Sequence, residues 1–134
     1  MIARLYSAAA GDVPALVITH SAVCAVVVCD VGLDPTMPEG ICPPPVFRVP
    51  LWNSPLNAMG PLTDFLLELP PSITALIVAD RTGTHLAPCL AETIARVWHL
   101  PVTHAHITEP PDVRLFAEWL GGLRLLALTA SAAP

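Results

Sequence analysis

Hydrophobic residues along the chain fall into short continuous runs separated by polar segments and by stretches of helical periodicity. AVVVCDV, residues 25–31, has three consecutive valines, and ITALIVAD, residues 73–80, is almost wholly apolar. Runs of this length that are rich in β-branched residues predict buried strands. VFRVPLW, residues 46–52, fits an edge strand or a strand that stops at Val49, because Pro50 cannot donate to a ladder. The other predicted strands are Ile2–Tyr6, 102–107 and 123–130.

A helix is predicted over residues 53–69, NSPLNAMGPLTDFLLEL. Asn53 or Ser54 can serve as its N-cap, and a proline in the first turn suits the start of a helix. Gly60 and Pro61 are expected to delay or kink it.

Two more helices are predicted, from about residue 84 to 99 and from about 112 to 120, each bounded by proline or glycine. Residues 13–23, VPALVITHSAV, fit either a helix or a strand, because so short an apolar run does not settle the period. The proline-rich segment 32–45 is predicted to be a long loop.

Strands that alternate with helices predict βαβ crossovers. The fold class is therefore α/β, with a single Rossmann-like domain over residues 1–134 and a mostly parallel sheet flanked by helices on both faces. Ligands of such sheets bind beyond the carboxyl ends of the strands. Three polar segments are expected there: SAAAGD (7–12), NSP (53–55) and DRTGTH (80–85).

The composition limits the classes of partner. Hydrophobic residues make up 54% of the 134 residues and charged residues 13%, so disorder is not expected and some apolar surface is expected to be shared in a homodimer. The net charge of −5 argues against a surface for long nucleic acids. All six basic residues are arginine, so an anionic ligand has to be small and held locally.

Neither a membrane span nor a cofactor is expected. The most apolar stretch, residues 15–29, is interrupted by polar residues and is shorter than a spanning helix, and no signal peptide is evident, so a cytoplasmic protein is expected. The four cysteines form no CxxC pair and are expected to pack as small hydrophobes. His85, Cys89, His104 and His106 are the alternative, a metal site, but their spacing matches no common metal motif, so no metal is expected.

The segment DRTGTH joins a strand to a helix, where backbone amides and the helix dipole can hold an anion. Asp80 can accept hydrogen bonds from a ribose hydroxyl or orient an arginine. Thr82 and Thr84 supply hydroxyl groups, and Gly83 allows a ligand to approach the backbone.

A cation and an imidazole beside a helix N-terminus suit a phosphate, which makes Arg81 and His85 candidates for its recognition. Ser7 and Asn53 are the ligand-binding candidates of the other two segments. An ordinary helix cap uses the same Thr-Gly-Thr chemistry without any ligand, and this alternative stays open.

The segment DRTGTH resembles the strand, D-x-T-G-G-T-K and helix signature of CARF domains, Rossmann-like modules of CRISPR systems that bind cyclic oligoadenylates. It has one glycine fewer, and His85 stands where the family tends to have lysine. CLAETIARVWHLPV, residues 89–102, resembles the helix-to-strand passage of small single-domain CRISPR-associated proteins. The resemblance covers about a third of the chain.

The resemblance implies a homodimer that binds a cyclic RNA messenger across its two-fold axis and either sequesters it or cleaves it as a metal-independent ring nuclease. For cleavage, Arg81 and His85 are the candidate catalytic residues. The alternatives are a Rossmann-like protein that acts on a small phosphorylated metabolite and a subunit that docks on another protein.

Overall fold

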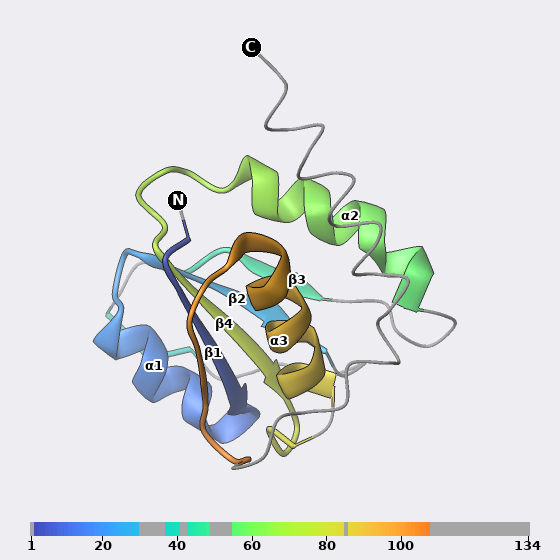
Figure 1. The fold of residues 1–134 in the computed structure, drawn as a ribbon. Helices are drawn as coiled ribbons and strands as arrows, with labels where there is room; N and C mark the ends of the chain where they lie inside the picture. Colours follow the sequence, from blue (N-terminus) through green and yellow to red (C-terminus); the bar gives the residue numbers. More distant parts are fainter. Residues whose placement is uncertain (1, 30–36, 41–42, 49–54, 85, 108–134) are drawn as a thin grey trace.

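Five parallel strands form one sheet in the order β3-β2-β4-β1-β5, and helices cover both of its faces (Figure 1). This computed structural model describes residues 2–29, 37–40, 43–48, 55–84 and 86–107. All strand pairs are parallel, as the alternation of strands and helices predicts. The elements are β1 (Arg4–Ala9), a 3-10 turn η1 (Ala10–Asp12), α1 (Val13–Thr19), β2 (Cys24–Val28), β3 (Val46–Arg48), α2 (Pro55–Glu68), β4 (Ala75–Asp80), α3 (Leu86–Trp98) and β5 (Val102–His104).

The centre of the sheet consists of the most apolar segments of the sequence. Every residue of β2 and β4 is buried, because each of these strands has neighbours on both sides and helices above and below. The β1–β4 register runs from Arg4 opposite Ala75 to Ala9 opposite Asp80, so these two strands end at the same level. The short β3 lies at one edge of the sheet, as its proline-flanked sequence predicts.

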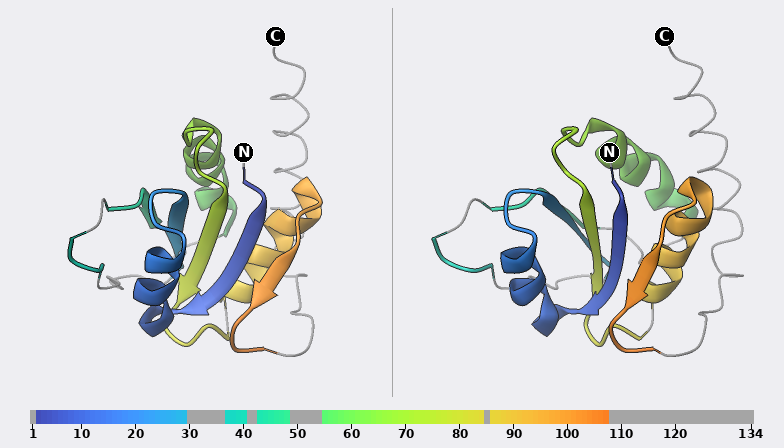
Figure 2. Two further views of the ribbon diagram at one scale, coloured as in Figure 1. Left: turned by 90° about the vertical axis from the view of Figure 1, so that its left-hand side faces the viewer. Right: turned by 60° about the vertical axis from the view of Figure 1, so that its left-hand side comes forward.

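Successive side chains of each strand point to opposite faces of the sheet, so the strands contribute to two separate hydrophobic cores, one on each face. Figure 2 shows the sheet edge-on, with α1 on one side and α2 and α3 on the other. Leu62 and Leu66 of α2 and Leu90 and Ile94 of α3 pack on the larger core. The smaller core contains Val13 and Val17 of α1 together with strand residues such as Val26 and Ile77.

The direction of the crossovers positions the site. The chain leaves β1 through α1 on one face of the sheet and leaves the neighbouring β4 through α3 on the other face. Two adjacent parallel strands whose following helices diverge in this way define a topological switch point, the position at which open α/β sheets generally bind ligands. The segments after Ala9 and Asp80 therefore border the place at which α/β sheets of this type bind ligands.

Several predicted boundaries are corrected by tertiary contacts. β1 continues through Ser7 to Ala9 because β4 supplies partners for its whole length, so the predicted stop at Tyr6 is wrong. The ambiguous segment 13–23 contributes the helix α1, with Pro14 in its first turn. The helix α2 runs on through Pro61, whose side chain is exposed. β5 ends at His104, three residues earlier than predicted.

The other predicted elements lie outside the described residues. These are most of the loop 32–45, the N-cap of α2, and the helix and strand of the C-terminal segment 108–134. In the part of the chain that is described, no helix is both long enough and apolar enough to cross a membrane.

Candidate functional site

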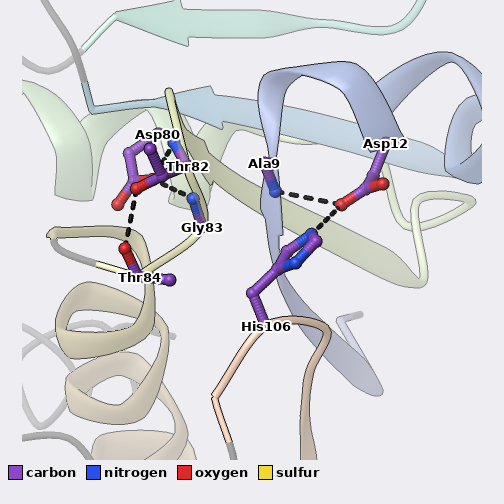
Figure 3. A network of polar contacts seen from close by, with 7 residues as sticks. All are labelled: Ala9, Asp12, Asp80, Thr82, Gly83, Thr84 and His106. Carbon is purple, nitrogen blue, oxygen red and sulfur yellow. Dashed lines mark hydrogen bonds and ion pairs between the residues drawn. The ribbon is translucent and has the colours of Figure 1, made fainter.

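Polar groups from four segments meet beyond the carboxyl ends of β1 and β4 (Figure 3). They come from the end of β1, from η1, from the loop 80–84 that follows β4, and from the bend that follows β5. Residues far apart in the sequence come together here because parallel strands all end at the same edge of the sheet.

Asp80 shapes the loop after β4 from inside. The residue is 1% exposed, and its carboxyl group accepts hydrogen bonds from three backbone amides. Oδ1 accepts from Thr82 at 3.0 Å and from Gly83, and Oδ2 accepts from Ala87, the second residue of α3, at 2.9 Å. The carboxylate thus lies at the N-terminus of α3 and complements the positive end of its dipole. The side chain of Asp80 therefore occupies the anion-binding position that was predicted at this helix end.

The side chains of the same loop that face outward are Arg81, Thr82 and Thr84, all of them exposed. The hydroxyl oxygens of the two threonines lie 2.7 Å apart and form a hydrogen bond. One hydroxyl donates in this bond, so the pair keeps one free O–H donor and several acceptor positions for a ligand.

Gly83 is buried and has a φ of +74°, a conformation that glycine adopts at little cost. A Cβ atom here would lie 2.8 Å from the nitrogen of Ala9, 2.9 Å from the carbonyl carbon of Ala8 and 2.7 Å from Cδ2 of His106. The close approach that this glycine permits is therefore to the end of β1 and to an imidazole of the protein.

His106 and Asp12 form a pair beyond the carboxyl end of β1. Nε2 of His106 contacts Oδ2 of Asp12, and the same oxygen accepts a hydrogen bond from the amide of Ala9 at 3.2 Å. The hydrogen bond from His106 is the main cause that holds the pKa of Asp12 below its ordinary value. Both side chains remain open to solvent, with 38% of His106 and 41% of Asp12 exposed.

A second histidine, His104, is enclosed between β1, β5 and α3. Its Nδ1 lies 2.6 Å from the hydroxyl oxygen of Ser7, and its Nε2 lies 2.9 Å from a carboxylate oxygen of Glu92 on α3. Ser7 has no exposed surface, and only 14% of the His104 side chain is exposed. Both ring nitrogens are satisfied inside the fold.

The structure brings together most, but not all, of the predicted site residues. Asp80, Thr82, Gly83 and Thr84 lie together at the end of β4 and in the loop that follows it (Figure 3). Ser7 lies within β1, where its hydroxyl group contacts His104. Asn53 and His85 lie outside the described residues, so the predicted role of His85 stays a prediction.

The roles of Asp12 and Glu92, whose carboxylates bind His106 and His104, were not predicted from the sequence. Asp12 lies in a segment that was expected at this edge, but its partner is 94 residues away, and no local pattern links the two. Because His104 and His106 have separate partners, they do not share a site. The described residues contain no group of three or more metal-ligating side chains.

An apolar hollow of about 620 Å³ lies at the opposite, amino edge of the sheet. Its lining comes from the residues before β1, β4 and β5 and from the ends of α2 and α3. The lining residues are Ile2, Leu66, Leu67, Leu69, Pro71, Trp98 and Leu100.

The chain matches no protein-family model, no curated protein and no solved structure.

Proposed function

We propose that the protein is a cytoplasmic homodimer that binds cyclic oligoadenylate, a small cyclic RNA messenger of type III CRISPR signalling, at the carboxyl edge of its sheet. The observation that carries the proposal is the position of the loop 80–84. The loop has the CARF-like sequence, and it follows β4 at the topological switch point between β1 and β4. The CARF-like motif therefore lies at the position where open α/β sheets generally bind ligands.

The chemistry of the exposed groups suits a phosphodiester. Arg81 supplies a guanidinium group, which pairs well with phosphate oxygens, and the threonine hydroxyl pair can donate to a phosphate or accept from a ribose. Because Asp80 already occupies the N-terminus of α3, we expect the phosphates to contact these side chains and not the helix end.

The distribution of arginines fits a small anionic ligand on an acidic protein. Among the described residues, Arg48 is the last residue of β3 and Arg81 directly follows β4, whereas Arg4 and Arg96 belong to the amino side. β3 and β4 are separated by one strand, so the two arginines at the carboxyl edge arise about 10 Å apart across the sheet. A pair of subunits would double this charge around a ring with two-fold symmetry.

Binding of cyclic tri-, tetra- and hexa-adenylate to the purified full chain tests the proposal by calorimetry and by thermal unfolding. A ligand present at one hundred times its dissociation constant adds about 2.7 kcal/mol to stability. For a domain of this size we expect a rise in Tm of about 10 °C with the correct ring. Linear oligoadenylate of the same length should give a smaller rise.

Two matched variants locate the site. Thr82→Val removes one exposed hydroxyl of the loop and is expected to weaken ring binding by about 5- to 10-fold, the worth of a typical hydrogen bond. Thr74→Val makes the same change at an exposed position just before the other end of β4 and should leave binding unchanged. If no ring binds to the wild-type chain, the proposal is wrong and a protein-docking role becomes the better hypothesis.

A further inference from the structure

Two histidines two residues apart each pair with a carboxylate, but only one of them keeps a nitrogen available. In the buried pair, His104 uses both ring nitrogens, one toward Ser7 and one toward Glu92. That arrangement satisfies three polar groups inside the fold and exposes none of them to a ligand, so it ties β5 and α3 to β1.

The second pair is open. The Asp12 carboxylate can only accept, so the contact with His106 makes Nε2 the protonated nitrogen of the neutral ring. Nδ1 then carries the lone pair, and among the described residues it has no hydrogen-bond partner. With 38% of its side chain exposed, His106 lies beyond the end of β1 and beside the loop 80–84 (Figure 3).

The position of the imidazole is fixed from two sides. The Ala9 amide donates to the oxygen of Asp12 that contacts His106, so the carboxylate is tied to the end of β1. The ring lies against Gly83, at the place where any other residue would put its Cβ. The glycine of the CARF-like loop thus makes room for a histidine that comes from the segment after β5.

We propose that His106, oriented by Asp12, is the general base with which the protein opens its cyclic ligand. The inference rests on the proposed function, because it takes the bound ring as substrate. A carboxylate that holds one imidazole nitrogen protonated while the other accepts a proton is the arrangement by which hydrolases activate a hydroxyl group. Here the hydroxyl would be the 2′-OH of a ribose in the ring.

The reaction needs no metal and no second substrate. The 2′ oxygen attacks the adjacent phosphorus as its proton passes to Nδ1 of His106, and the bond from phosphorus to the 5′ oxygen breaks. The 5′ oxygen takes a proton from water, and the imidazolium returns its proton to the solvent. The product is a linear oligoadenylate with a 2′,3′-cyclic phosphate and a 5′-hydroxyl group, so atoms and charge balance.

The charged groups around His106 are compatible with this role. The carboxylate of Asp12 contacts His106. Because this carboxylate is negative, it repels a phosphate oxygen and favours an uncharged hydroxyl group next to the imidazole. On the neighbouring loop Asp80 is committed to backbone amides, and Arg81 can stabilise the charge that grows on the phosphate oxygens. His104, the last residue of β5, is bound to Glu92.

Single-turnover cleavage of cyclic oligoadenylate, with the full chain in excess, tests the assignment. His106→Ala should slow ring opening by about 100- to 10,000-fold, the range for a positioned general base, while ring affinity stays within about 3-fold. Added imidazole should restore part of the rate, because the small base can enter the space left by the ring.

His99→Asn is the matched control, because His99 is exposed before the amino end of β5 and its φ of +54° suits asparagine. Asp12→Asn should slow opening by tens of fold, since Asp12 positions the base without touching the substrate.

The outcomes separate the two proposals. If the wild-type chain binds the ring but leaves it intact over hours, or if His106→Ala opens it within about 3-fold of the wild-type rate, the general base is wrong and the binding function stands. If His106→Ala loses affinity and rate together without rescue by imidazole, His106 is structural and the inference is again wrong. If the wild-type chain binds no ring, both proposals fail.

Discussion

A series of three glycine-to-alanine variants tests the packing at the centre of the site. At Gly11 no heavy atom lies within 4 Å of the position that a Cβ would take, and φ is not positive, so this variant measures the effect of the added methyl group alone. Gly40 also has open space but a φ of +78°, so it measures the conformational cost. Gly83 combines a φ of +74° with three contacts below 3.0 Å, two of them to the backbone of β1.

The expected magnitudes follow from these differences. Gly11→Ala should change the free energy of unfolding by less than about 1 kcal/mol, with a small gain from the stiffer unfolded chain. Gly40→Ala should cost about 1–2 kcal/mol for the left-handed conformation. Gly83→Ala adds overpacking against backbone atoms that cannot rotate away, typically about 1–3 kcal/mol, for a total of about 2–5 kcal/mol. A domain of 134 residues with about 7–20 kcal/mol of stability remains folded after such a loss.

Urea unfolding at neutral pH, followed by far-ultraviolet circular dichroism, measures all three variants against the wild type. The order of stability should be Gly11→Ala above Gly40→Ala above Gly83→Ala, with unchanged m-values. If Gly83→Ala costs no more than Gly40→Ala, the end of β1 and His106 do not lie against Gly83, and the geometry described for the site is wrong. The double variant with His106→Ala should recover part of the loss, because one of the three contacts disappears.

Asp80→Asn places an amide group where three backbone donors converge and should lower the free energy of unfolding by about 1.5–3 kcal/mol. The control Asp64→Asn, at an exposed position, should change it by less than about 0.5 kcal/mol. Equal effects of the two substitutions in urea unfolding would show that Asp80 does not anchor the loop. Because the pKa of Asp12 is lowered in the fold, its carboxylate stabilises the protein above its ordinary pKa, and this contribution disappears as the pH falls through the lowered value. Unfolding measured from about pH 7 to about pH 2 should therefore show a smaller acid loss for Asp12→Asn than for the wild type. Arg81→Ala should slow ring opening by about 100-fold while the ring still binds at high protein concentration. A rate near that of the wild type would show that Arg81 takes no part in the reaction. Light scattering at micromolar concentration should give the mass of a dimer, twice the 14.2 kDa of one chain, and a monomer would contradict the argument from composition.

The elements with strong local signals were predictable from the sequence. The valine run of β2 and the apolar run of β4 can be buried only at the centre of a sheet, and their alternation with helices requires parallel pairing. The loop 80–84 was predictable as a turn at a strand end, because aspartate, threonine and glycine have local conformational preferences that hold in any context.

The length of β1 was not predictable from the sequence. Small residues such as Ser7 and Ala9 have weak preferences for strands, and they are extended here because β4 offers partners up to Asp80. The helix α1 was ambiguous for a similar reason, since an apolar segment of seven residues takes the conformation that its packing surface favours.

The sequence by itself determined the fold class, the burial of β2 and β4, and the position of a polar loop at the carboxyl edge, because these follow from local composition and period. Only the tertiary structure decided what each polar group does there. It turned Asp80 inward onto the helix end, enclosed Ser7 with His104 and Glu92, and placed Asp12 beside an exposed His106. Such pairings join residues as many as 97 positions apart, and a contact over that distance depends on strand order and register, which no local pattern encodes.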